Sequence, residues 1–96
     1  MGNEVSQPLT FSLGQAYPNP FNPSTVVPFS LAEDAFVSMK VYNVLGREVM
    51  SLVSAHKQAG VYRQMVAMND LPAGMYFLRL DVPGHFSSVR KLVLVK

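Results

Sequence analysis

Residues 74–82 read Gly74-Met75-Tyr76-Phe77-Leu78-Arg79-Leu80-Asp81-Val82, and no other stretch is as informative about the fold class. Every second residue from Tyr76 to Val82 is apolar and shares one face (Tyr76, Leu78, Leu80 and Val82), while Arg79 and Asp81 fall on the opposite face. A period of two is the signature of a β-strand with one face buried and the other in water. The stretch therefore predicts a half-buried strand.

Other parts of the chain repeat this pattern. In residues 36–43, Val37, Met39 and Val41 share one face, whereas Ser38 and Lys40 share the other. Less regular runs predict further strands over residues 25–31, 47–53, 61–68 and 85–95, with a short one near 9–13. No run has the spacings of three and four over ten or more positions that an amphipathic helix requires.

Turn-forming residues separate these runs about every ten to fifteen positions. The separators are Leu45-Gly46-Arg47, Gln58-Ala59-Gly60, Asn69-Asp70, Pro72-Ala73-Gly74 and Pro83-Gly84. Glycine permits a positive φ angle, and proline fixes the bend of a turn. Because two sheets must cover each other to bury their apolar faces, this spacing predicts an all-β, antiparallel β-sandwich of about seven strands.

Pro28 lies inside the predicted strand 25–31. Proline has no backbone N–H to donate to a neighbouring strand, so we expect this strand to lie at a sheet edge or to bulge at Pro28. On an edge, a proline discourages another chain from adding there.

The composition limits the class of protein. The chain has 96 residues, of which 49% are hydrophobic and 15% charged, as expected for one packed domain. It has no cysteine, which excludes disulfides and thiolate metal sites. No apolar run approaches the roughly 20 residues of a membrane span. All eight basic residues lie within 40–96 and are interspersed among apolar ones, a pattern that does not indicate nucleic-acid binding.

An active site is not indicated. The two histidines, His56 and His85, lie in turn-rich polar segments, and the adjacent acids Glu33 and Asp34 diverge along an extended chain. No nucleophile elbow, metal-binding helix or phosphate loop is present in the sequence. We therefore predict a protein that is not an enzyme and has no catalytic, metal or cofactor-binding residues.

Four motifs resemble a known family. They are Leu13-Gly14-Gln15-Ala16-Tyr17-Pro18-Asn19-Pro20-Phe21-Asn22-Pro23-Ser24-Thr25, Val41-Tyr42-Asn43-Val44-Leu45-Gly46-Arg47-Glu48-Val49, Pro72-Ala73-Gly74-Met75-Tyr76-Phe77-Leu78-Arg79-Leu80 and Arg90-Lys91-Leu92-Val93-Leu94-Val95-Lys96. Over residues 13–96 the chain resembles the C-terminal sorting domain of type IX secretion, also called the Por secretion sorting domain. The pattern is also similar to the immunoglobulin-like domain of flagellar hook-capping proteins.

The resemblance implies an immunoglobulin-like sandwich that acts as a C-terminal sorting signal. Such a domain directs a secreted cargo protein through the periplasm and across the outer membrane of a Gram-negative bacterium, to the cell surface or the medium. Its implied partners are the secretion machinery at the outer membrane and an N-terminal cargo domain of the same polypeptide. Residues 1–12 are then a linker, a segment left from expression or a short first strand, and any export signal lies elsewhere.

The first motif supplies most of the candidate structural residues, which are Tyr17, Pro18, Asn19, Pro20 and Phe21, together with Gly46 of the second motif. Three prolines within residues 18–23 make a stiff, non-helical loop. We expect the rings of Tyr17 and Phe21 to pin this loop over the edge of the sandwich.

The last two motifs supply the candidate recognition residues: Pro72, Gly74, Tyr76, Lys91, Val93, Val95 and Lys96. For the first three, the favoured interpretation is structural, a tight turn that delivers Tyr76 onto a strand. Val93 and Val95 give the last strand a second apolar face. Either residues 1–12 cover that face, or it is a docking surface whose backbone edge and side chains a receptor reads, with Lys91 and Lys96 as steering charges.

A carbohydrate-binding or cell-attachment module of a secreted hydrolase is the main alternative function. Sugar-binding sandwiches generally expose a row of planar aromatic rings, but the chain has no tryptophan. Tyr42, Tyr62 and Tyr76 all fall at strand positions that can belong to the core. The sorting function is therefore favoured.

Overall fold

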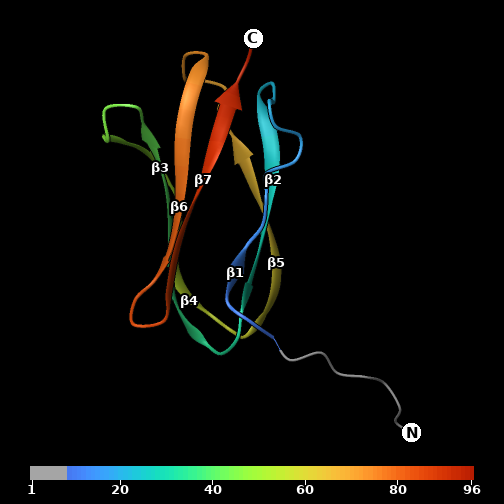
Figure 1. Cartoon of the computed structure of the whole chain (residues 1–96), viewed down its shortest axis with the longest axis vertical. Helices are drawn as coiled ribbons and strands as arrows, with labels where there is room; N and C mark the ends of the chain where they lie inside the picture. Colours follow the sequence, from blue (N-terminus) through green and yellow to red (C-terminus); the bar gives the residue numbers. More distant parts are fainter. Residues whose placement is uncertain (1–8) are drawn as a thin grey trace, which may run out of the picture.

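Seven β-strands make up the fold of residues 9–96, the part of the chain that the computed structural model describes, and none of these residues is helical. The strands are β1 (Ser12–Leu13), β2 (Ser24–Leu31), β3 (Ala35–Asn43), β4 (Glu48–Lys57), β5 (Gly60–Ala67), β6 (Gly74–Val82) and β7 (Phe86–Leu94). They form two antiparallel sheets, in the orders β1-β2-β5 and β4-β3-β6-β7 (Figure 1). The predicted all-β sandwich is confirmed.

The strand order is that of an immunoglobulin-like domain. Strands β1, β2 and β5 lie opposite β3, β6 and β7, and the remaining strand, β4, joins the edge of the second sheet beside β3. Within the described residues, no helix could cross a membrane.

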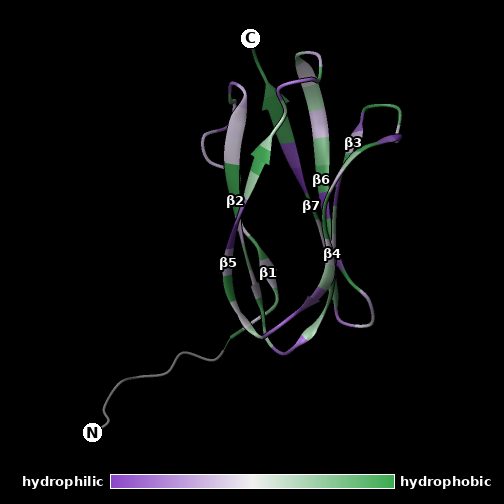
Figure 2. Cartoon of the chain, turned by 180° about the vertical axis from the view of Figure 1, so that it is seen from behind, coloured by the Kyte–Doolittle hydropathy of each residue, from purple (hydrophilic) through white to green (hydrophobic). Residues whose placement is uncertain are grey.

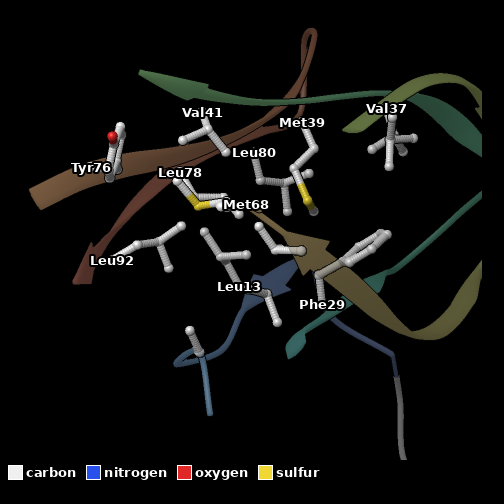
Figure 3. Packing of buried hydrophobic residues seen from close by; sticks show 14 of the residues in the cluster. Leu13, Phe29, Val37, Met39, Val41, Met68, Tyr76, Leu78, Leu80 and Leu92 are labelled. Carbon is white, nitrogen blue, oxygen red and sulfur yellow. The ribbon is translucent and has the colours of Figure 1, made fainter. Parts of the chain in front are cut away.

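The alternation read from the sequence matches the burial of the two central strands. Val37, Met39 and Val41 of β3 are fully buried, as are Leu78 and Leu80 of β6. In the other sheet, inward-facing side chains of β1, β2 and β5 and of the turn after β5 complete the core: Leu13, Val27, Phe29, Leu31, Val66 and Met68. Figure 3 shows side chains from the two layers pointing toward one another. The sandwich is therefore stabilised by one continuous apolar layer.

Strand β4 is longer than predicted. The sequence pattern ended this strand at residue 53, but it continues to Lys57, which is paired with Ala35 of β3. Register shifts interrupt the β3–β4 pairing between Met39 and Lys40 and between Val41 and Tyr42. Because β4 is an edge strand whose last four residues are largely exposed, no burial alternation marks its end.

The expectation that Pro28 sits on an edge strand or in a bulge is wrong. Strand β2 is the middle strand of its sheet, and its register with β5 is continuous through the pair Pro28 and Arg63. The Pro28 carbonyl accepts a hydrogen bond of 2.8 Å from the backbone N–H of Gly14. The N–H and C=O groups of a residue in an antiparallel strand point to the same side. The nitrogen of Pro28 therefore faces Gly14 rather than β5, and its lack of a hydrogen removes no hydrogen bond between β2 and β5.

The two ends of the sandwich differ. The described chain enters at the lower end in Figure 1, whereas the C-terminus, the β3–β4 turn and the β5–β6 turn gather at the upper end. The loop between β1 and β2 also lies at the upper end. Of the N-terminal segment assigned to residues 1–12, residues 1–8 lie outside the described residues, and Ser12 begins β1. Most of the candidate residues are thus far from the point where the chain enters.

Candidate recognition surface

The loop between β1 and β2 covers the outer edge of β7. Here the Asn19 side chain donates a hydrogen bond of 2.9 Å to the Lys91 carbonyl and accepts one of 2.9 Å from the Val93 N–H. The backbone of Phe21 continues the pairing, because its N–H donates to Val93 O at 3.0 Å and its carbonyl accepts from Val95 N–H at 2.9 Å. The backbone edge of residues 91–95 is therefore occupied, contrary to the expectation that a receptor strand would read it.

The structural residues of the loop hold it in different ways. Phe21 is buried, with 2% exposure, and anchors the loop in the core. The Tyr17 ring is 81% exposed, so the expectation that it pins the loop is wrong; its backbone instead bridges Val26 through bonds of 2.9 and 3.2 Å. The Pro18 carbonyl accepts a bond of 2.6 Å from the buried Thr25 hydroxyl. Pro20 is exposed.

The β3–β4 turn presents an apolar tip. The Asn43 side-chain oxygen accepts hydrogen bonds from the N–H groups of Leu45 (2.9 Å) and Arg47 (3.0 Å), and Gly46 adopts a φ of 83° that favours glycine. This local network leaves Val44 65% exposed and Leu45 85% exposed. The tip is coloured hydrophobic in Figure 2. Two consecutive apolar residues between Asn43 and Gly46 were the only sequence signal for it.

Tyr76 lies in the core. Its side chain is 5% exposed, and its hydroxyl donates a hydrogen bond of 2.6 Å to the Pro72 carbonyl four residues upstream. A tyrosine near the start of the sixth strand with this bond is the tyrosine corner of immunoglobulin-like sandwiches. Pro72 and Gly74 remain exposed at the turn that the corner holds.

The two groups of candidate recognition residues lie on neighbouring strands. Gly74 pairs with Leu94 and Tyr76 with Leu92, so residues 72–76 and 91–96 meet at the upper end of the four-stranded sheet. On the outward face Lys91 is exposed, Val93 is half-buried and Val95 is 43% exposed. Lys96 is exposed at the chain end.

The described part of the N-terminal segment does not cover that face. The Phe11 ring stacks on His85 at 5.1 Å and on Phe86 at 6.3 Å, which places it at the opposite end of β7. Residues 9–12 therefore leave Val93 and Val95 uncovered. Residues 1–8, the rest of that segment, lie outside the described residues.

Two hollows adjoin at this end of the molecule. The larger, of about 370 Å³, is lined by Tyr42, Asn43, Val44, Gly46, Phe77, Arg79 and Val89. The smaller, of about 250 Å³, is lined by Asn43, Val44, Val49, Leu71, Pro72, Ala73, Gly74, Met75 and Tyr76. Asn43 and Val44 belong to both, so the β3–β4 turn separates two parts of one irregular surface. The larger hollow was missed by sequence reasoning, because its lining comes from outward positions on three strands and from one turn.

Charges at this surface are mostly positive. Lys40 forms an ion pair of 3.3 Å with Glu48, and both side chains are partly exposed. Arg79 and Lys91 are exposed and form no ion pair with any residue in 9–96. The same part of the chain holds no group of three or more metal-ligating side chains. The arrangement offers apolar contact and positive charge to another molecule.

The fold is that of an immunoglobulin-like β-sandwich with an exposed apolar and positively charged surface at one end. The family model described as the secretion system C-terminal sorting domain matches residues 15–96, so the chain belongs to this family, the sorting domain of type IX secretion. No curated protein and no solved structure gives a significant match to the chain. The resemblance carried by the four sequence motifs is confirmed.

Membership defines the general role of the domain. It is a C-terminal sorting signal, and the family is non-catalytic. Sorting domains are attached to an N-terminal cargo and are recognised by the secretion machinery. The family implies secretion to the cell surface or the medium.

Proposed function

We propose that this chain is not an enzyme and acts as a folded sorting signal. It is recognised at the outer membrane of a Gram-negative bacterium after its cargo has reached the periplasm. The family match over residues 15–96 is the observation that carries the proposal. The cargo is the N-terminal part of the same polypeptide. The proposal includes no cofactor. It also includes no nucleic acid, since the basic residues are spread among apolar ones rather than clustered.

The sorting domain comprises residues 13–96. Leu13, in β1, is 3% exposed and belongs to the core, so a boundary after it would remove a buried side chain. Residues 1–12 connect the domain to the cargo. The chain enters the sandwich at the end opposite the C-terminus, which leaves the C-terminal end accessible when a cargo is attached (Figure 1).

The candidate recognition residues divide into two roles. Lys91, Val93, Val95 and Lys96 contact the machinery; this role is supported by the outward positions of Lys91 and Val93 on β7 and by the exposure of the two residues that follow the strand. Pro72 and Gly74 shape the rim of the smaller hollow. Tyr76 acts from inside by holding the turn through its bond to Pro72.

A reporter fusion tests the function. Residues 13–96 are joined to the C-terminus of a reporter that carries a signal peptide, and the fusion is expressed in a host with the secretion machine and in the same host without it. We expect release or surface display only where the machine is present. Retention in the periplasm of both hosts would contradict the proposal.

Charge reversal tests the role of the tail. Deleting residues 92–96 would also remove the buried Leu92 and Leu94, so the double variant Lys91→Glu, Lys96→Glu is the sharper change. Both lysines are exposed, and reversing them should leave the fold intact but the fusion unsecreted. Lys57→Glu, at the far end of β4, is the control and should be secreted normally. Equal secretion of the parent fusion, the double variant and the Lys57→Glu control would contradict a role of these two lysines in recognition.

A further inference from the structure

The larger hollow lies on the outward face of the four-stranded sheet. Tyr42 of β3 is paired with Phe77 of β6, and Phe77 with Lys91 of β7; in the next row, Arg79 is paired with Val89. Paired residues of adjacent strands project from the same face, so these five side chains form one patch. The β3–β4 turn closes one side of the hollow with Val44 and Gly46.

The patch exposes apolar side chains around the hollow. Val89 is 47% exposed, Met75 is 43% exposed, and the Val44 and Leu45 tip stands beside them. Single exposed apolar residues are ordinary, but a cluster of them rimmed by charge marks a contact site. At about 370 Å³, the hollow is also far larger than the roughly 30 Å³ that one water occupies. It can therefore accept a protruding side chain.

The charge around the hollow indicates the chemistry of the occupant. Arg79 lines the hollow and Lys91 stands beside Phe77, and within residues 9–96 neither cation has an acidic partner. Lys40, the cation opposite Arg79 on β3, is already paired with Glu48. The nearby acid Asp81 faces Ser38 and Ser87 in the following row. Carboxylates of a partner would complement the two remaining cations.

Two observations favour this face over other surfaces. The outer edge of β7 over residues 91–95 is closed by Asn19 and Phe21, so contact there by strand addition would require the loop to leave. The three-stranded sheet also exposes Val61 and Met65, but neither of the two hollows involves that sheet.

We propose that the hollow receives an apolar side chain from an acidic loop of a secretion-machinery protein, whose carboxylates pair with Arg79 and Lys91. The inference rests on the proposed function and deepens it by naming the sheet face that is recognised and the chemistry of the partner that binds there. Recognition then uses the face of the four-stranded sheet and leaves the edge of β7 closed.

Matched variants on the two sheets test the inference in the reporter fusion. Arg79→Glu and Val89→Asp alter the hollow, whereas Arg63→Glu and Val61→Asp make the same changes at exposed positions of β5. Circular dichroism and thermal melting establish that each variant is folded. Should Val89→Asp fail to fold, Val89→Ser replaces it, with Val61→Ser as its partner.

We expect secretion of the hollow variants to fall by about tenfold or more, with the reporter held in the periplasm, and the β5 variants to stay within about twofold of the parent. Normal secretion of the hollow variants, or an equal loss in the β5 variants, would overturn the inference. An unsecreted parent fusion would instead refute the proposed function. If the hollow variants are secreted normally but lose retardation by soluble polysaccharide on native gels, the hollow binds sugar and the inference is also overturned.

Discussion

The side-chain oxygen of Asn19 accepts a hydrogen bond of 2.9 Å from the backbone N–H of Val93, across 74 positions of sequence. The nitrogen of the same amide donates to the Lys91 carbonyl. One side chain thus supplies the acceptor and the donor that a neighbouring strand would supply. Since an unpaired sheet edge is a template for association with other chains, this loop protects the last strand of the domain.

Replacing Asn19 with alanine removes both bonds. Because water can reach these exposed groups, we expect the free energy of unfolding to fall by only about 1 kcal/mol, measured by chemical denaturation. The Val93 N–H should exchange with solvent faster, while the Val95 N–H, bonded to the Phe21 carbonyl, should change less.

Asn69→Ala is the control for this change. Asn69 lies in an exposed turn, and its side chain makes no hydrogen bond within residues 9–96, so its loss should cost less than about 0.5 kcal/mol. An unchanged Val93 exchange rate in Asn19→Ala would show that the amide does not close the edge.

Tyr76→Phe tests the tyrosine corner. It removes the hydroxyl that bonds the Pro72 carbonyl in a partly buried site, and we expect a loss of about 1 to 2 kcal/mol of stability. Tyr62→Phe removes an equivalent bond to the Gln58 carbonyl, also four residues upstream, at an exposed site. Thermal denaturation should show a loss below about 0.5 kcal/mol there. Equal losses at the two sites would mean that burial does not strengthen the corner.

Gly14→Ala tests the close approach of the first loop to β2. A Cβ atom on Gly14 would lie 2.7 Å from Cγ of Pro28, too close for two carbon atoms. We expect a destabilisation of about 1 to 3 kcal/mol, measured by denaturant unfolding. The double variant Gly14→Ala, Pro28→Ala should recover part of this loss because the ring is gone. A double-mutant cycle that shows no coupling free energy between the two substitutions would rule out this clash as the cause of the destabilisation.

Leu78→Ala and Leu45→Ala compare two leucines of very different burial. Leu78 is fully buried in β6, so its truncation should cost about 2 to 5 kcal/mol. Leu45 is 85% exposed at the turn tip, and its truncation should change stability by less than about 0.5 kcal/mol. Comparable losses in equilibrium unfolding would place Leu45 in a packed environment in solution.

Predictions from local pattern succeeded where one face of a strand is buried. β6 has the bounds that its alternation predicted, and the alternation in β3 identified the inward side chains Val37, Met39 and Val41. Prediction failed at the end of β4 and at Pro28. At the end of β4, side chains on both faces are exposed, so the sequence shows no alternation there. At Pro28, the number of lost hydrogen bonds depends on which neighbouring strand or loop faces the proline nitrogen.

The candidate site was only partly predictable. The family motifs led to residues 72–76 and 91–96, which the strand register then placed side by side. The lining of the larger hollow was not predicted, because the sequence pattern left Tyr42 at a position that can belong to the core and did not connect it with Phe77 or Val89, whereas all three line the hollow. The Tyr17 ring is exposed although its motif suggested an anchor, since backbone bonds to Val26 hold the loop there.

Alternation of side chains and the positions of turn residues were enough, without coordinates, to predict an all-β sandwich, and the resemblance of four sequence motifs indicated its family. Both are local properties, because each strand reveals its buried face through its own residues. Closure of the β7 edge and the larger hollow emerged only in three dimensions. Each joins segments distant in the chain, Asn19 with Val93 and Tyr42 with Val89, and such contacts depend on sheet register, which no single segment encodes.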